Sequence, residues 1–331
     1  MKNLSYTFII LILAFLYAAC SSNNHQSVFH PKGLWLDNNG VHINAHGGGM
    51  LYNNGIYYWF GEHKIEGEAG NIAHVGVHCY SSENLQEWTD EGIALSVAPE
   101  GSGSDIEKGC ILERPKVVYN AATKKYVMWF HLELKGEEYS AARSGVAISD
   151  KITGPYNFIR SLRPNGEMAR DMTVFIDDDA TAYHIFSSED NKTTHIAELS
   201  DDYLSHTGKY VRVFPERYME APAVFKRNGN YYFIGSGCTG WAPNAARSAI
   251  AQSIWGPWTE LGNPCRGENA ELTFGAQSTY VQKVHGKEDL YIFMADEWRP
   301  ENAIDGRYVW LPISFEEEKP VINWQTEWKM D

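Results

Sequence analysis

Residues 46–60 read HGGGMLYNNGIYYWF: an apolar run, an Asn-Asn-Gly turn and an aromatic return run. An Asn-Gly step between two such runs is a strong signal for a β-hairpin. The stretch opens on a polar residue, His46, nine positions before the turn glycine Gly55. The same spacing recurs twice, between Glu220 and Gly229 and between Gln277 and Gly286. One hairpin cassette is therefore repeated along the chain.

Two further copies open on Glu113 and Asp171, and their turns fall at 120–123 and 177–179. A second apolar element follows each hairpin, at 76–82, 145–149, 195–200, 248–253 and 307–311. Two hairpins for each unit make four strands, which is one blade of a propeller. Five such units predict an all-β fold, a five-bladed β-propeller.

The predicted domain organisation places a lipoprotein-type signal peptide at 1–20, a tether at 21–30 and a single catalytic propeller at 31–331. The apolar run from Tyr6 to Leu16 is too short for a transmembrane span. It ends in small residues before Cys20, and a polar Ser-Ser-Asn-Asn stretch follows. We expect an exported protein, anchored in a membrane by a lipid on Cys20, at the periplasmic side or the cell surface; ordinary secretion is the alternative.

Composition narrows the class of partner. The formal net charge is −14, and no cluster of Lys and Arg stands out, which argues against nucleic acid. Aromatic residues make up 13% of the chain, and some of them can serve as flat platforms for sugar rings. We expect a monomer that binds a neutral plant polysaccharide or oligosaccharide, with no cofactor and no metal.

Four cysteines remain after Cys20, and an even number permits disulfides in an exported protein. Cys238 and Cys265 lie within one repeat unit and can pair; buried thiols are the alternative. The chain holds no Cys-x-x-Cys, which argues against a zinc knuckle.

The five opening residues give the strongest indication of function. The innermost strands of a propeller surround one axis, so residues at the same register should form a ring. Three members of this ring are carboxylic acids. Glycoside hydrolysis needs one protonated carboxyl group and a second group that activates water or attacks carbon. Neighbouring carboxylates raise one another's pKa, which favours one protonated acid near neutral pH.

Several longer motifs resemble glycoside hydrolase family 43, and within it the exo-β-1,3-galactanase branch. They are 46–49 (HGGG), 113–116 (ERPK), 170–173 (RDMT), 220–222 (EAP) and 237–241 (GCTGW). The resemblance covers the whole mature chain. It implies a five-bladed propeller and an inverting hydrolase that cleaves β-1,3-galactan or arabinogalactan-type plant glycans.

The resemblance also implies roles for residues. Glu220 would be the general acid, and Asp171 would orient and tune it. Most of the family carries an Asp general base in the first blade, where this chain has His46. In the galactanase branch a glutamine in the fifth blade positions or activates the water, and the matching residue is Gln277. Glu113 stays open, either as the base or as a group that binds a sugar hydroxyl.

Sugar-binding candidates share a polar or aromatic side chain near the expected funnel. They are His46, Arg114, Tyr139, Thr239, Trp241, Glu62 and Glu189. The alternatives are an α-L-arabinofuranosidase or β-xylosidase of the same family, and a glycan-binding propeller that has lost catalysis. An esterase is disfavoured because no Gly-x-Ser-x-Gly occurs. A helical zinc site at His42 and His46 lacks the glutamate that such a site needs.

Overall fold

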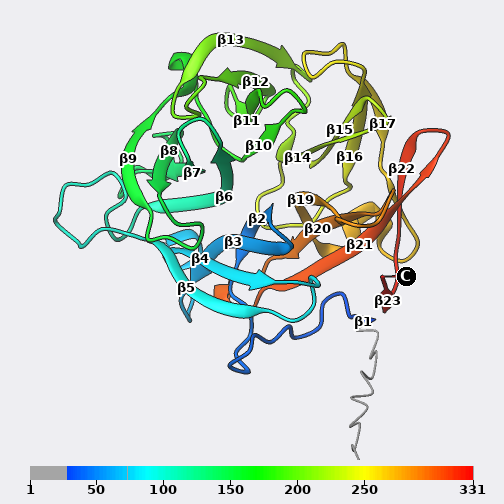
Figure 1. Cartoon of the computed structure of the whole chain (residues 1–331), viewed down its shortest axis with the longest axis horizontal. Coiled ribbons are helices and arrows are strands. Elements are labelled where there is room, and N and C mark those ends of the chain that lie inside the picture. Colours follow the sequence, from blue (N-terminus) through cyan, green and yellow to red (C-terminus); the bar gives the residue numbers. More distant parts are fainter. Residues whose placement is uncertain (1–27, 73, 331) are drawn as a thin grey trace, which may run out of the picture.

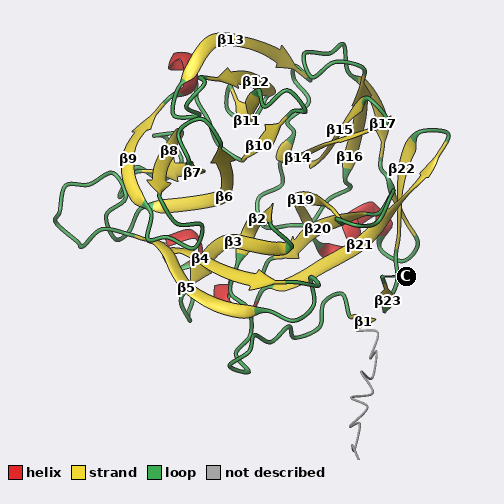
Figure 2. Cartoon of the chain, viewed as in Figure 1, coloured by secondary structure: helices red, strands yellow, loops and turns green. Residues whose placement is uncertain are grey.

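The computed structural model describes residues 28–72 and 74–330, and the signal peptide and most of the tether predicted above lie outside them. Five sheets, whose strands pair almost entirely antiparallel, surround a central axis (Figure 1). Almost all regular structure is strand, with four short 3₁₀ turns (Figure 2). The five-bladed propeller is confirmed. In the described part of the chain, no helix has the length and hydropathy to cross a membrane.

Each of the first four blades contains four strands in chain order. Blade one holds β2 (His46–Asn53), β3 (Ile56–Lys64), β4 (His74–Ser82) and β5 (Thr89–Ser96). Blade two holds β6 (Ile111–Asn120), β7 (Lys125–Glu133), β8 (Arg143–Ser149) and β9 (Asn157–Leu162). Blade three holds β10 (Met172–Ile176), β11 (Ala182–Ser188), β12 (Thr193–Leu199) and β13 (His206–Val213). Blade four holds β14 (Glu220–Arg227), β15 (Asn230–Ser236), β16 (Arg247–Ala251) and β17 (Thr259–Gly262).

Blade five contains a fifth strand. It holds β19 (Gln277–Lys283), β20 (Tyr291–Glu297), β21 (Arg307–Glu316) and β22 (Lys319–Asn323), and β18 (Cys265–Arg266) pairs with β22 in parallel. The innermost strands β2, β6, β10, β14 and β19 contact one another in that order, and β19 contacts β2. The ring is therefore closed, and every innermost strand faces the axis.

The folded domain begins earlier than the predicted boundary at residue 31. Strand β1 (Val28–Phe29) pairs with β23 (Trp328–Lys329), so the two ends of the described chain meet beside blade five (Figure 1). Phe29 is buried and stacks on Trp328 at a ring-centroid distance of 4.3 Å. This apolar contact joins the ends of the propeller outside its blades.

The hairpin register follows from local turn chemistry. Asn54 and Gly55 both have positive φ, as a two-residue hairpin loop requires, and Gly229 and Gly286 also have positive φ. Large aromatic side chains fill the interfaces between blades, and Trp59, Trp129 and Trp310 are fully buried. Trp129 donates its indole N–H to the carbonyl of Tyr203 in the next blade, at 2.8 Å. Most of the aromatic excess therefore stabilises the scaffold that holds the funnel.

Cys238 and Cys265 do not form the disulfide considered above. The four described cysteines, Cys79, Cys110, Cys238 and Cys265, are all thiols. Cys265 is buried in the core of blade five, whereas Cys238 is exposed at the central cavity. A shared repeat unit places the two residues near each other in sequence, but they lie in different environments.

Candidate active site

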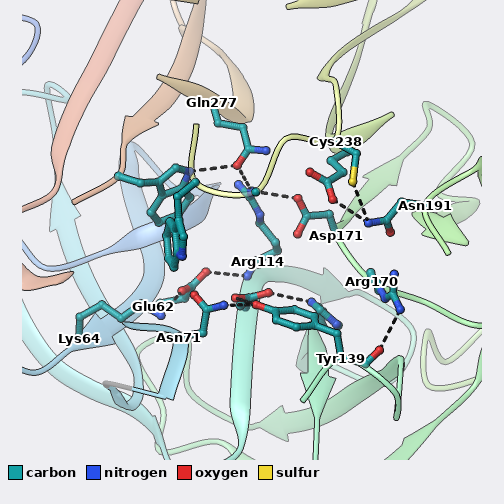
Figure 3. A pocket seen from close by; sticks show the side chains of 16 residues that line it. Glu62, Lys64, Asn71, Arg114, Tyr139, Arg170, Asp171, Asn191, Cys238 and Gln277 are labelled. Atoms are coloured by element: carbon teal, nitrogen blue, oxygen red, sulfur yellow. Dashed lines mark hydrogen bonds and ion pairs between the residues drawn. The ribbon is translucent and has the colours of Figure 1, made fainter. Parts of the chain in front are cut away.

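A cavity of about 330 Å³ lies where the five innermost strands begin, and side chains from all five blades line it (Figure 3). Four of the five opening residues meet there: Glu113, Asp171, Glu220 and Gln277. The remaining lining residues are Glu62, Lys64, Asn71, Arg114, His131, Tyr139, Arg170, Asn191, Cys238, Gly240, Trp241 and Trp298. The convergence on one pocket that the repeat register predicts is therefore present.

An irregular backbone step directs the opening residues inward. The strand register shifts just after the opening residue of β2, β6 and β14. In these blades the next residue is left-handed, with φ of 59° at Gly47, 57° at Arg114 and 52° at Ala221. Arg114 and Ala221 adopt this conformation without the freedom of glycine, so the surrounding structure must stabilise the bulge.

A repeated hydrogen bond supplies that stabilisation. Each bulge N–H donates to a carboxylate on the preceding blade, at 2.6 to 3.0 Å: Gly47 to Asp296, Arg114 to Glu62, and Ala221 to Asp171. An N–H bond to a charged oxygen is stronger than a neutral one. These three bonds link neighbouring blades at the cavity and hold two of its carboxylates in place.

Glu220 has the properties of a general acid. Its Oε1 accepts a hydrogen bond from the side-chain amide of Asn191 at 2.7 Å, and its carboxyl group lies beside Cys238. Burial, reinforced by the negative charge of Asp171, raises the pKa of Glu220 to about 7. A carboxyl group with this pKa stays protonated in mildly acidic solution and can donate its proton.

Asp171 and Arg114 form the centre of the polar network. Asp171 Oδ2 lies 2.9 Å from a guanidinium nitrogen of Arg114, and both side chains are mostly buried. Arg114 also donates to the backbone carbonyl of Ser278 and to the side chain of Gln277. Burial opposes the charge of Arg114, but the Asp171 carboxylate outweighs it and raises the pKa of the guanidinium. Arg114 is therefore a fixed cation that connects blades two, three and five.

Glu113 is held in the opposite protonation state to Glu220. Its Oε2 accepts from His131 Nδ1 at 3.0 Å, and its Oε1 accepts from the Tyr139 hydroxyl at 2.9 Å. Burial opposes ionisation, but the hydrogen bond and charge of His131 lower the pKa of Glu113 to about 2. Glu113 is therefore a carboxylate throughout the working range and a weak proton acceptor.

Gln277 is held by three partners. Its Oε1 accepts hydrogen bonds from a guanidinium N–H of Arg114 and from the indole N–H of Trp298, at 2.5 and 3.0 Å. Its Nε2 donates to the hydroxyl of Ser236 at 2.9 Å. Because both oxygen contacts come from donors, the orientation of the amide is determined. Both lone pairs of the amide oxygen are occupied in this arrangement.

Glu62 and Lys64 form a buried ion pair at the cavity wall. Lys64 Nζ lies 2.8 Å from Glu62 Oε2, and both side chains are at most 3% exposed. Burial raises the pKa of Glu62, and Lys64 counteracts this effect. Oε2 of Glu62 is bound to Lys64, and its Oε1 accepts the backbone N–H of Arg114.

His131 does not suit a metal ligand in this cavity. Glu113, His131 and Asp171 bring potential ligand atoms within 4.8 Å of one another. However, both ring nitrogens of His131 contact carboxylate oxygens, of Glu113 and of Glu133. A metal ligand must present an unprotonated nitrogen, and burial does not prevent these two bonds from raising the pKa of His131 to about 10.

Three sugar-binding candidates lie outside this cavity. His46 is buried against the ring of Tyr308, and neither of its ring nitrogens has a partner among the described residues. Thr239 donates its hydroxyl hydrogen to the carbonyl of Ala242. Glu189 is paired with Arg212 through both carboxylate oxygens. None of these three side chains lines the cavity, and their contact with sugar stays a prediction.

Four candidates line the cavity: Arg114, Tyr139, Trp241 and Glu62. Trp241 is 41% exposed and meets Trp298 edge to face at 6.0 Å. The guanidinium of Arg114 lies 5.2 Å from the centre of the Trp298 ring. An exposed indole at the mouth suits the apolar face of a sugar. The roles of these side chains remain predictions.

Sequence reasoning missed several cavity residues, including His131, Asn191, Cys238 and Trp298. A signal for some of them was present. The position opposite each opening residue on the second strand is polar and lies 16 to 19 residues downstream: Glu62, His131, Ser187, Ser236 and Asp296. These five polar positions on the second strands form a second ring, which predicts that His131 lies at the cavity. Asn191 lies on a loop and has no such regularity.

Comparisons with known proteins agree with this geometry. The family model described as glycosyl hydrolases family 43 matches residues 46–317. A family 43 β-1,3-galactosidase, solved with galactodeoxynojirimycin, is 49% identical; the match covers 91% of this chain and 100% of that one, with a TM-score of 0.88. The exo-β-1,3-galactanase of Phanerochaete chrysosporium, solved in variant form with β-1,3-galactotriose, is 32% identical; the match covers 92% and 69%, with a TM-score of 0.84.

A curated relative has a different printed specificity. The β-D-galactofuranosidase of Aspergillus niger is 31% identical over 222 residues. The match covers 61% of this chain and spans 63% of the relative's length. The family match extends over most of the propeller, and the cavity holds the carboxyl groups that glycoside hydrolysis needs. This chain belongs to glycosyl hydrolases family 43 and is a glycoside hydrolase that resembles the exo-β-1,3-galactanases.

Proposed function

We propose that the protein is an inverting exo-β-1,3-galactanase that removes galactose from β-1,3-galactan or arabinogalactan-type plant glycans. One observation carries this proposal: Glu220, with its pKa raised to about 7, and the ionised Glu113 line the same cavity. Acid-assisted cleavage of a glycosidic bond requires a protonated carboxyl group at the leaving oxygen, which Glu220 supplies, and an ionised carboxylate beside it can bind a sugar hydroxyl.

Glu220 protonates the glycosidic oxygen as the bond from that oxygen to the anomeric carbon breaks. A water molecule attacks the anomeric carbon from the opposite face, and the proton that it loses passes to solvent water, because neither the Gln277 amide nor the low-pKa Glu113 holds it. Asp171 keeps Glu220 protonated through its negative charge and is itself held by Arg114 and the N–H of Ala221. The amide oxygen of Gln277 already accepts hydrogen bonds from Arg114 and Trp298. These bonds must lengthen before the same oxygen can accept a hydrogen bond from the attacking water.

Glu113 suits a substrate-binding role better than that of the base. Its low pKa makes it a poor proton acceptor, whereas an ionised oxygen binds a sugar hydroxyl strongly. The cavity volume of about 330 Å³ lies at the lower end for small-molecule sites, which suits one terminal sugar better than a continuous chain. This size supports exo action.

Product analysis tests the proposal. β-1,3-Galactotriose should release galactose and a disaccharide first, and proton NMR of the first galactose should show the α anomer. A β anomer contradicts inversion. Arabinan, xylan and a β-galactofuranoside serve as competing substrates, and faster cleavage of any one of them contradicts the proposed specificity. A glycan-binding protein without activity would bind galactotriose and release no sugar.

We also propose that the mature protein is exported and held at a membrane by a lipid on Cys20. The supporting observation is the apolar run that ends in small residues before this cysteine. Metabolic labelling with an alkyne fatty acid tests it: the wild type should incorporate the label, and a Cys20→Ser variant should not. Labelling of both proteins, or of neither, contradicts the anchor.

A further inference from the structure

A line of side chains extends from the cavity into the interior of blade two. Glu113 and His131 both border the cavity, and Glu133 lies behind His131. His131 Nδ1 is 3.0 Å from Glu113 Oε2, and His131 Nε2 is 2.8 Å from Glu133 Oε1. The other oxygen of Glu133 accepts the backbone N–H of Ala142 at 2.7 Å. His131 and Glu133 are almost completely buried.

With both carboxyl groups ionised, the contacts determine the charge of the imidazole. An ionised carboxylate can only accept hydrogen bonds, so each ring nitrogen that faces one must donate. A neutral imidazole has one N–H, whereas the imidazolium has two. Two buried carboxylates without a cation between them would be strongly destabilised. His131 therefore balances one of the two negative charges, and the group retains a net charge of −1.

We propose that His131 is a positioning residue: as a permanent imidazolium, with Glu133 as its buried counter-ion, it holds Glu113 ionised and correctly oriented at the cavity. This inference rests on the proposed function, because hydrolysis gives Glu113 its role. It goes beyond that function by assigning a purpose to two residues that do not act on the substrate.

The other charged and titratable groups near Glu113 and His131 do not replace His131 as the cation that holds Glu113. They are Lys64, Arg114, Glu62, Asp171 and Tyr139, which face the cavity from blades one, two and three. Lys64 is paired with Glu62, and the guanidinium of Arg114 is bound to Asp171 and Gln277. Tyr139 is already a donor to Glu113, and burial raises its pKa. His131 alone bridges Glu113 to a second carboxylate among the described residues.

The ionised Glu113 has two effects in the cavity. It offers a strong acceptor for a sugar hydroxyl, with Tyr139 fixing its second oxygen. Its charge also contributes to the raised pKa of Glu220, after burial and Asp171. Loss of the imidazolium should therefore weaken substrate binding at the low end of the pH range, where Glu113 would become protonated.

The protonation state can be measured directly on the wild-type protein. Nitrogen-15 NMR of labelled histidines should show one imidazole with both nitrogens protonated from pH 5 to 9. A His131→Gln variant should lack this signal, which assigns it. If the assigned imidazole instead titrates near its ordinary pKa of about 6.5, the inference is overturned.

Kinetics distinguish a positioning role from a structural one. With β-1,3-galactotriose, His131→Gln should lower kcat/KM by about 10- to 100-fold, the loss of one charge-assisted hydrogen bond. The acidic limb of the pH profile of kcat/KM should also move to higher pH in this variant, because Glu113 loses the partner that lowers its pKa. His30→Gln, at an exposed position outside the cavity, is the matched control and should match the wild type. An equal loss at every pH indicates a structural role and overturns the inference.

A second variant keeps the test decisive if His131→Gln does not fold. Glu133→Gln retains an acceptor for His131 and removes its counter-ion, so the imidazole signal should shift and begin to titrate. An unchanged signal overturns the inference. The proposed function fails separately: if the wild type shows the imidazolium yet releases no sugar from galactotriose, the galactanase proposal falls and the assignment of His131 stands.

Discussion

Replacement of Glu220 by Gln should stabilise the protein, and the gain should depend on pH. Burial and the charge of Asp171 raise the pKa of Glu220 from its ordinary value of 4.5 to about 7. Between these two values the folded protein binds more protons than the unfolded chain, so the stability of the wild type falls as pH rises. The amide introduced by the substitution carries no ionisable proton and avoids this loss.

The magnitude follows from the size of the shift. A difference of about 2.5 pKa units corresponds to about 3 kcal/mol, at 1.36 kcal/mol for each unit. The difference in unfolding free energy between Glu220→Gln and the wild type should grow by up to about 3 kcal/mol between pH 4.5 and 7. It should remain constant above that range. The stability of the wild type thus changes with pH in the opposite direction to that of a protein with a salt-bridged carboxylate, whose ionisation stabilises the fold.

Urea denaturation at half-unit pH intervals from 4 to 8.5 measures this difference. Glu288→Gln, at an exposed turn of blade five, is the control and should show no growth with pH. Activity of Glu220→Gln on β-1,3-galactotriose should fall by about 10²- to 10⁴-fold, as for the loss of a general acid. If the stability difference stays constant across the pH range, Glu220 is ionised normally and the reasoning is refuted.

Three other outcomes follow from the cavity and its scaffold. Arg114→Lys should lower kcat/KM on β-1,3-galactotriose by about 10- to 100-fold, because an ammonium cannot reproduce the fork that binds Asp171 and Gln277; rates near those of the wild type contradict this. Gly61→Ala should lower the free energy of unfolding by at least about 1–3 kcal/mol in urea, because its Cβ would lie 2.1 Å from the backbone carbon of Ala45; an unchanged midpoint argues against the close approach. Apart from Cys20, Cys238 should be the first thiol to react with a chromogenic disulfide, since it is the exposed cysteine of the described chain, and equal reaction of a second thiol contradicts the packing.

The blade count and the ring of opening residues could be predicted because they depend on local chemistry. An Asn-Gly turn fixes a hairpin register, and closure of five similar hairpins brings equivalent positions to one axis. Glu113, Asp171, Glu220 and Gln277 follow from that rule and line one cavity. His46 shares the register but lies away from the cavity, because its ring packs on Tyr308.

The rest of the site depends on side-chain contacts that the repeat register does not specify. Asn191 reaches Glu220 from a loop of blade three, and no periodicity marks such a position. His131 lies 18 residues after Glu113 on the second strand of the same hairpin, so its position follows the repeat. Its charge does not, because that depends on Glu133, two residues further on the same strand, whose side chain also reaches the ring.

The opposite states of Glu113 and Glu220 arise from their neighbours and not from their shared place in the repeat. Both directly precede a bulge in an innermost strand, and both face the same cavity. Glu113 meets a cation, His131, while Glu220 meets an amide, a thiol and the negative charge of Asp171. The first environment favours a carboxylate and the second favours a neutral acid. A propeller thus supplies equivalent positions, and differences on the second strand and in the loops give two of them opposite protonation states.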